Sequence, residues 1–150
     1  MEKHLKVSAI KDGTVIDHIP TKALFKVIKI LKLEKCDQMV TFGNNLDSKA
    51  MGTKAIIKIA NRFFADEEVN KIALVAPHAK LNTIRDYKVI EKRVVETPQE
   101  IIGIVRCFNP KCITNSESII TRFEVLSNKP IAMKCFYCEK ITNEKELSFF

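Results

Sequence analysis

The pattern of hydrophobic and polar residues starts with a period of two. Leu5, Val7 and Ala9 alternate with polar neighbours, and a β-branched run follows the turn signal at residues 12–13. Alternation of this kind is typical of strands that bury one face. We therefore predict strand structure over residues 5–19.

Two later segments change to a helical period of three to four residues. Pro20 suits the first turn of a helix, and apolar residues recur from there to Leu31 while lysines occupy the other side. A second apolar stripe covers residues 69–76, with Asp66 as the predicted N-cap and Pro77 as the stop. The lysine face is typical of a solvated helix surface. A nucleic-acid stripe is the alternative, although no aromatic residues interleave with the lysines.

Short apolar runs between these helices indicate further strands. We predict them over residues 39–42, 55–59 and 81–90. The resulting order is β, α, β, β, α, β with an added strand. Two helices over one face of an antiparallel sheet bury both apolar stripes, so the sequence predicts an α+β fold whose N-terminal part is a ferredoxin-like antiparallel sheet with two helices.

The apolar pattern lapses around residues 96–99, and we expect the domain boundary there. The predicted domains are residues 1–97 and 98–150. Short strands in the second domain predict a small antiparallel β structure, and they are expected over residues 101–105, 121–125 and 131–134 and after residue 140. A domain of about fifty residues has little core of its own and commonly needs a metal or disulfides.

Four cysteines in the second domain provide that reinforcement. Cys107 and Cys112 form one close pair on a turn, and Cys135 and Cys138 form the other. Two such pairs bring four thiolates to the corners of a tetrahedron, with Zn–S distances of about 2.3 Å. The spacing predicts one structural Zn²⁺ per chain, because four sulfurs leave no open ligand position.

Three other interpretations of the cysteines stay open: four buried free thiols, two disulfides in a secreted protein, and a redox-active pair. A redox Cys-x-x-Cys pair usually opens a helix, whereas Cys135 follows an apolar stretch without helix signals. The fifth cysteine, Cys36, has no evident partner in the sequence. We expect no role for it.

Charge is distributed unevenly between the predicted domains. The net charge is +7, with 18 Lys/Arg and 12 Asp/Glu in residues 1–97 but 7 against 6 in residues 98–150. A zinc ribbon that binds nucleic acid is expected to carry the basic excess itself. Polyanion binding is therefore expected in the first domain, and nucleic acid is not the expected partner.

No hydrophobic run is long enough for a membrane span, and the first four residues begin no signal-peptide pattern. Thiolates available for zinc fit a reducing compartment. We predict a cytoplasmic protein with no membrane partner.

Candidate catalytic groups form no constellation in the sequence. Asp17 and His18 are adjacent, and neighbours on a strand point to opposite faces unless a turn intervenes. The four glycines match no phosphate-loop pattern. The chain is not expected to be an enzyme by itself.

Lysines on the predicted strands suggest an anion site. If the strands that hold Lys58 and Lys92 are neighbours, their ammonium groups converge on one phosphate chain, with Lys54 just before the first of these strands. Solvent-exposed strand lysines are the alternative.

Several segments, in their order and at their intervals, resemble one known family. They are residues 12–20, reading Asp-Gly-Thr-Val-Ile-Asp-His-Ile-Pro, residues 51–54, 57–59 and 76–77, and both cysteine pairs. The family is the regulatory chain of aspartate carbamoyltransferase, and the match covers nearly the whole chain. The first motif combined with both cysteine pairs is more specific than any single segment.

The resemblance implies a non-catalytic regulatory subunit. Its N-terminal allosteric domain would bind nucleoside triphosphates, with CTP as inhibitor and ATP as competing activator, and so control the first committed step of pyrimidine biosynthesis. Its C-terminal zinc domain would dock on the catalytic chain and hold catalytic subunits together. A homodimer of regulatory chains within a larger hetero-oligomer is also implied.

The resemblance also assigns residues to these roles. The positions that contact ribose and phosphates are matched by Asp17, Lys58 and Lys92, and those near the phosphates by His18 and Lys54. The positions that border the base are matched by Ile10, Tyr87 and Val89, and the docking positions beside the zinc by Asn109 and Glu139.

Two positions depart from the family pattern or leave it open. Lys111 stands where the family often has asparagine, which puts one polar contact to the catalytic chain in doubt, and Ser8 leaves effector preference open. The alternative function is a zinc-ribbon nucleic-acid-binding protein, whose binding would fall steeply with salt and ignore base identity. A redox protein using Cys135 and Cys138 is a third possibility, and it requires an accessible thiolate of low pKa.

Overall fold

The computed structural model describes residues 8–150, so residues 5–7 of the first predicted strand lie outside the described part. The chain divides into two units, one ending at Glu96 and the other comprising Thr97–Phe150. The N-terminal unit contains β1 (Gly13–Ile19), α1 (Leu24–Ile30), β2 (Val40–Ser48), β3 (Gly52–Ala60), α2 (Asp66–Asn70), β4 (Lys80–Arg85) and β5 (Lys88–Val94). Short 3-10 helices are η1 (Thr21–Ala23), η2 (Leu33–Lys35) and η3 (Lys71–Leu74).

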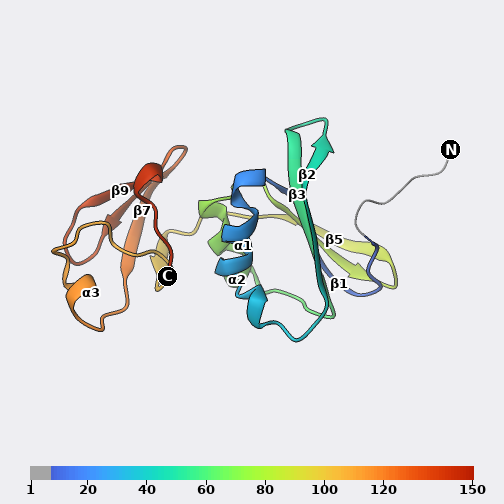
Figure 1. Cartoon of the computed structure of the whole chain (residues 1–150), viewed down its shortest axis with the longest axis horizontal. Helices are drawn as coiled ribbons and strands as arrows, with labels where there is room; N and C mark the ends of the chain where they lie inside the picture. Colours follow the sequence, from blue (N-terminus) through green and yellow to red (C-terminus); the bar gives the residue numbers. More distant parts are fainter. Residues whose placement is uncertain (1–7) are drawn as a thin grey trace. The chain divides into compact units, whose positions relative to one another are not determined.

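The strands of this unit form one antiparallel sheet in the order β2-β3-β1-β4-β5. The first four strands have the ferredoxin-like arrangement, and β5 extends the sheet beyond β4. Figure 1 shows α1 and α2 on the same face of the sheet. The predicted α+β fold class is therefore confirmed.

The core of the N-terminal unit lies between the sheet and its helices. Ile16 on β1 is paired with Ile57 on one side and Leu81 on the other, and all three side chains are buried. They belong to the same cluster as Leu24 and Val27 of α1. The alternating strand pattern and the helical stripe thus meet in one apolar layer.

The opposite face of the sheet has its own small apolar cluster. Ile10, Val15 and Ile84 are buried there, with Ile56 packed against them. Because side chains alternate along a strand, the neighbours of the core residues point to this face. We call it the outer face, and it carries most of the residues that the family resemblance assigns to nucleotide binding.

The second predicted helix differs in detail from the prediction. It is α-helical only over α2 and continues as the tighter η3, and its N-cap is Ala65. Asp66 is the first helical residue and forms no side-chain cap, so that prediction was wrong. Its carboxylate still lies at the positive end of the helix, where a negative charge is favourable.

Three strand predictions in this unit were also wrong. Residues 8–12 were expected in a strand, but they form none and β1 begins only at Gly13. The predicted strand at residues 81–90 is a hairpin, because Asp86 and Tyr87 both adopt positive φ, at 50° and 64°. Strand β2 continues through residues 43–45, where we expected it to end, by means of a register shift near Asn45, whose φ is 57°. Such turns and bulges need left-handed backbone, which Asn and Asp tolerate better than most residues.

The C-terminal unit contains β6 (Glu100–Ile102), α3 (Ile113–Ser116), β7 (Arg122–Asn128), β8 (Ile131–Cys135), β9 (Ile141–Asn143) and η4 (Glu144–Glu146). Its strands form an antiparallel sheet in the order β6-β7-β8-β9. Strand β6 is shorter than predicted because the chain turns at Gly103, whose φ is 71°. Among the described residues, no helix is long and apolar enough to cross a membrane.

Candidate metal centre and ligand-binding face

The four cysteines of the C-terminal unit converge on one point. Their sulfur atoms all lie within 4.8 Å of one another. Cys107 Sγ is 3.6 Å from Cys138 Sγ, and Cys112 Sγ is 3.8 Å from Cys135 Sγ. Each of these contacts joins one cysteine pair to the other, so the two loops close around a common centre.

The sulfur positions fit a tetrahedral metal. A tetrahedron with metal–sulfur distances of about 2.3 Å has sulfur–sulfur edges of about 3.8 Å. A disulfide would need about 2.05 Å, and all four cysteines are free. The disulfide interpretation is therefore excluded for this structure. The second pair does not open a helix, because Cys135 ends β8 and Cys138 lies between β8 and β9.

Side chains after Cys112 hold the first loop in shape. Asn115 Nδ2 donates to the carbonyl oxygens of Cys107, at 2.9 Å, and Asn109, at 2.7 Å. The hydroxyl of Thr114 donates to Cys112 Sγ at 3.1 Å. Both residues lie on α3, and sequence reasoning missed them because a short helix directly after a cysteine carries no distinctive signal.

The thiols differ in acidity because their surroundings differ. Burial raises the pKa of Cys107 and of Cys135 above the ordinary thiol value. Burial also acts to raise the pKa of Cys138, but hydrogen bonds from the Lys140 backbone and the Asn109 side chain outweigh it and lower that pKa to about 7. Cys138 is therefore the thiol readiest to deprotonate, as a metal ligand must.

The predicted docking residues beside the cysteines have different exposures. Asn109 is buried, and its side-chain oxygen accepts a hydrogen bond from the Lys111 backbone at 3.1 Å. Glu139 is exposed and has a φ of 63° at the end of the second loop. Lys111 is exposed as well. The side chain of Asn109 is thus hydrogen-bonded within its own loop, whereas the side chain of Glu139 is exposed to solvent.

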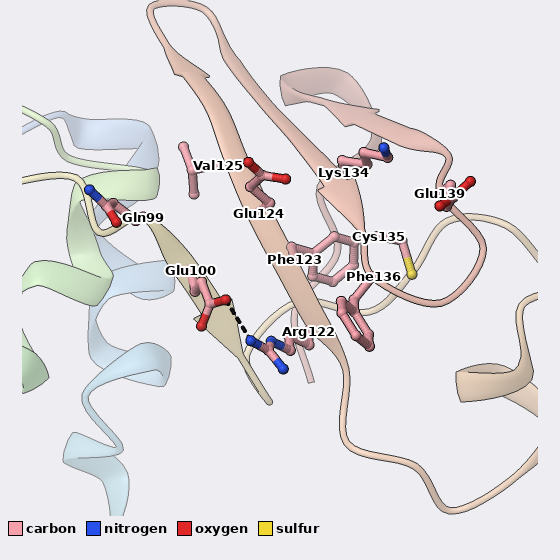
Figure 2. Close-up of a pocket in the computed structure, with 10 residues that line it drawn as sticks. All are labelled: Gln99, Glu100, Arg122, Phe123, Glu124, Val125, Lys134, Cys135, Phe136 and Glu139. Atoms are coloured by element: carbon pink, nitrogen blue, oxygen red, sulfur yellow. Dashed lines mark hydrogen bonds and ion pairs between the residues drawn. The ribbon is translucent and has the colours of Figure 1, made fainter.

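A hollow of about 670 Å³ lies on the sheet of the C-terminal unit next to the second loop. Figure 2 shows Arg122 beside the Phe136 ring and joined to Glu100 by an ion pair. The Arg122 guanidinium lies 2.7 Å from Glu100 and 4.7 Å from the centre of the Phe136 ring. Cys135 and Glu139 also line it. The hollow therefore adjoins the cysteine loop and has a polar and aromatic rim.

On the outer face of the N-terminal sheet, Asp17 is the centre of a charged cluster. Lys54 Nζ lies 2.9 Å from an Asp17 carboxylate oxygen, and His18 Nδ1 lies 3.7 Å from one. His18 has a φ of 59° in an irregular step of β1, so its side chain does not point away from Asp17 as simple alternation predicts. His18 Nδ1 is buried without a hydrogen-bond partner among the described residues.

Lys58 lies two residues beyond Ile56 on the same face and is largely buried. Its Nζ donates to the Ser8 carbonyl oxygen at 3.0 Å. Burial lowers the pKa of Lys58, while the nearby Asp17 carboxylate opposes that shift. A bound anion stabilises the charged form of a lysine in such surroundings, because the anion compensates for the hydration that the ammonium group loses on burial.

The strands that hold Lys58 and Lys92 are not neighbours, so the condition under which we expected their ammonium groups to converge is not met. Two strands separate β3 from β5, and the register aligns Lys58, Val15, Asn82 and Lys92 in one row. Three interstrand steps of about 4.8 Å place the two lysine Cα atoms about 14 Å apart on the same face. The two ammonium groups can therefore meet different parts of one extended ligand.

The remaining base-bordering positions lie around the same face. Ile10 and Val89 both lie next to Ile84. Ile10 belongs to the same buried cluster as Ile84, and Val89 on β5 is paired with Ile84 on β4. Tyr87 is exposed in the β4–β5 turn, and its backbone N–H donates to the Lys11 carbonyl oxygen at 2.8 Å. The structure thus places the segment around residue 10 beside the β4–β5 turn.

Sequence reasoning missed two further polar residues of the outer face. Asn82 lies in the row between Val15 and Lys92, and Lys80 is directly opposite Asp17. With Lys92 they line a hollow of about 590 Å³. Lys80 and Asn82 flank buried Leu81, so alternation along the strand places them on the face opposite to Leu81. Which other residues share that face could be known only from the strand order.

Comparison with known proteins identifies the two units. Residues 5–96 match the family model described as the aspartate carbamoyltransferase regulatory chain, allosteric domain, and residues 99–148 match the metal binding domain of the same chain. The chain belongs to this family. Its relatives are named as regulatory chains, so our prediction of a non-catalytic regulatory subunit is confirmed.

The curated relatives are similar over almost their whole length. The regulatory chain of Bacteroides fragilis is 53% identical over 144 residues, 96% of this chain and 94% of the relative. The chain from Pyrococcus abyssi is 55% identical over 145 residues, 95% of each. The chain from Parabacteroides distasonis is 49% identical over 146 residues, 97% of this chain and 95% of the relative. An aspartate carbamoyltransferase regulatory chain implies association with a catalytic chain.

Proposed function

We propose that this regulatory chain binds CTP and ATP on the outer face of its N-terminal sheet and thereby controls the first committed step of pyrimidine biosynthesis in the cytoplasm. The proposed nucleotide domain is residues 1–97, and the proposed docking domain is residues 98–150. The observation that carries the proposal is the gathering of Asp17, Lys54 and Lys58 on one face of the sheet, in register with Lys92.

Each charged group has a part in the proposed site. The ammonium groups of Lys54, Lys58 and Lys92 bind phosphate oxygens as point charges, with His18 beside them. The Asp17 carboxylate accepts hydrogen bonds from ribose hydroxyls. The excess of basic residues in the first domain, 18 against 12, supports a polyanionic ligand there.

Discrimination between bases is assigned to backbone groups. Ile10, Tyr87 and Val89 border the proposed base position, where backbone groups that are not already hydrogen-bonded within the protein, as the Tyr87 N–H is to Lys11, distinguish amino from keto substituents. The exposure of Tyr87 and Val89 supports this assignment. Tyr87 lies in the β4–β5 turn and Val89 near the start of β5, and a ligand can reach both.

The metal held by Cys107, Cys112, Cys135 and Cys138 is proposed to be Zn²⁺. Four thiolates with tetrahedral spacing match its preference, and they leave no coordination position for a substrate. When bound, the ion fixes the two cysteine loops without taking part in catalysis. One ion per chain is expected.

We assign docking on the catalytic chain to the surface around these loops. Large apolar side chains are exposed on both loops and directly after them, and they are Phe108, Ile113, Phe136 and Tyr137. Aromatic residues beside an arginine are typical of interface hot spots, and Arg122 lies against Phe136. Glu139 supplies a charged contact at the rim, and Asn109 acts through the shape of its loop. At this surface Lys111 places a positive charge where the family often has the polar amide of an asparagine.

We further propose that regulatory chains pair as homodimers within a larger assembly. Support comes from β2, an edge strand of the N-terminal sheet, and from exposed Phe25, Met39 and Phe42 on and beside it. The Phe25 and Phe42 rings stack edge to face with centroids 6.0 Å apart. An edge strand with an exposed apolar patch favours pairing with a second chain.

Reconstitution with the catalytic chain tests the proposal. The two chains are expected to co-purify, and CTP and ATP are expected to change the activity of the complex but not of the catalytic chain alone. Nucleotide binding should depend on the base. If binding instead falls steeply with salt and is insensitive to the base, the alternative of nucleic-acid binding is supported and the allosteric site is wrong.

A further inference from the structure

Four thiolates and Zn²⁺ carry a net charge of −2, which must be stabilised inside a small unit. Three of the four cysteines are buried, so hydrogen-bond donors from the protein must replace much of the hydration. Donors to metal-bound groups also orient them and tune the metal. Which donor serves each sulfur is therefore informative.

Backbone amides serve three of the sulfurs. The backbone N–H of Asn109 donates to Cys107, those of Tyr137 and Cys138 donate to Cys135, and that of Lys140 donates to Cys138. These donors follow from the tight turn of each cysteine loop. They depend on the backbone, so almost any sequence that keeps the turn would provide them.

Cys138 has a side-chain donor, Asn109, in addition to its backbone donor. Cys112 differs, because the donor that serves it among the described residues is a side chain without a backbone amide beside it. The Thr114 hydroxyl donates to Cys112 Sγ at 3.1 Å, and both residues are buried, at 8% and 1% exposure. Thr114 lies on α3, two residues after Cys112, and Asn115 on the same helix is hydrogen-bonded to the first cysteine loop. The hydroxyl is thus held against the sulfur by a fixed element.

We propose that Thr114 is a positioning residue of the metal centre: its hydroxyl completes the set of thiolate donors and holds Cys112 in its coordinating orientation. The hydrogen bond withdraws negative charge from the Cys112 sulfur. This makes the sulfur a weaker nucleophile and stabilises the charged cluster as a whole. The inference rests on the proposed assignment of Zn²⁺ to the four cysteines.

Replacing Thr114 with valine removes the hydroxyl and preserves the shape of the side chain. In the full-length protein, Thr114→Val is expected to bind Zn²⁺ roughly ten- to a hundredfold more weakly in a competition titration with a chromophoric chelator. It should also release Zn²⁺ faster to a mercurial. Thr114→Ser keeps a hydroxyl at this position and is expected to restore most of the affinity.

Thr121→Val is the matched control. Thr121 is also a buried threonine of the same unit, but its hydroxyl donates to the Val105 carbonyl oxygen at 2.7 Å and not to a sulfur. Its substitution is expected to lower the thermal stability of the unit without changing the zinc ligands. Comparing the two valine variants separates loss of a thiolate donor from loss of a buried hydrogen bond.

Cobalt substitution provides a readout that a purely structural role would not change. With Co²⁺ in place of zinc, a less hydrogen-bonded thiolate gives up electron density more readily, so the sulfur-to-cobalt charge-transfer band should move to lower energy in Thr114→Val. It should stay in place in Thr114→Ser and Thr121→Val. The band reports the sulfur itself and needs no catalytic chain.

The outcomes separate this inference from the proposed function. If the unmodified protein binds no Zn²⁺ or Co²⁺, both the metal assignment and the inference fail. If it binds one ion normally and Thr114→Val matches it in affinity, release rate and cobalt spectrum, the inference is overturned and the zinc assignment stands. The same holds if Thr121→Val weakens zinc binding as much as Thr114→Val does.

Discussion

The two candidate sites of this chain are built in different ways. In the C-terminal unit, four side chains of one type lie within 4.8 Å of one another, and short local loops supply them. On the outer face of the N-terminal sheet, the polar groups come from β1, β3, β4 and β5, and Lys58 and Lys92 are separated by two intervening strands. One site is compact and local, and the other is distributed over a sheet.

This difference determines how each site responds to change. Removing one ligand from a compact metal site leaves an incomplete coordination shell in a unit with a small core, so site and fold fail together. Removing one contact from a distributed site leaves a sheet whose core lies on its other face. We therefore expect all-or-none effects in the C-terminal unit and graded effects in the N-terminal unit.

The largest effect is expected for Cys138→Ser. Zinc content should fall from one ion per chain to near zero, and the C-terminal unit should lose its structure, because the metal contributes directly to its folding free energy. Metal analysis and NMR spectra of the full chain measure both, and signals of the N-terminal unit should persist. An unchanged zinc content in folded Cys138→Ser would refute the four-sulfur site.

Lys58→Ala should weaken CTP binding by roughly ten- to a hundredfold, because it removes a charge-assisted hydrogen bond contributing on the order of 1.5–3 kcal/mol. Calorimetry measures the affinity, and circular dichroism should show an intact N-terminal unit. Lys26→Ala is the control, since Lys26 is exposed on α1 on the other side of the sheet. Equal affinities in Lys58→Ala and Lys26→Ala would contradict the proposed phosphate site.

Lys92→Ala tests the far end of the same face. Its Cα lies about 14 Å from that of Lys58, so it should contact a different phosphate and its loss should reduce the advantage of triphosphate over diphosphate. The comparison of CTP with CDP in the variant and in the unmodified chain measures this. A loss of affinity that is equal for both ligands would place Lys92 away from the terminal phosphate.

A smaller effect is expected from pH. Burial lowers the pKa of Lys58 in the free protein, and only its protonated form attracts phosphate. Affinity should be full below that pKa and should fall as the pH rises through it, earlier than for an ordinary lysine. In that range, binding should take up a proton, because phosphate raises the pKa again. Lys58→Arg, which stays charged, should abolish this pH dependence.

The local patterns of the sequence predicted much of the fold. The apolar stripe ending at Leu31, the β-branched run of β1 and the spacing of Cys107 to Cys138 each depend on neighbouring residues, and the structure has all three. The disagreements came from backbone conformation. Asp86 and Tyr87 turn the chain with positive φ, and His18 does so within β1, although none of these is glycine.

The distributed site was harder to predict because it depends on strand order. The sequence left open whether the strands of Lys58 and Lys92 are adjacent, and in the structure β1 and β4 lie between them. Asn82 and Lys80 were missed since their side of the sheet is set by register with Asp17 and Val15. Pairing between distant segments is specified by packing of the whole sheet and is not visible in a short stretch of sequence.

The central claim is that one unit binds nucleotide and the other docks on the catalytic chain. It is tested most directly by measuring the CTP response of the reconstituted complex before and after a mercurial removes the metal. We expect the complex to dissociate, the catalytic activity to remain and become insensitive to CTP, and thiol plus Zn²⁺ to restore assembly and regulation. A complex that stays assembled and responds to CTP after complete metal removal would contradict the claim.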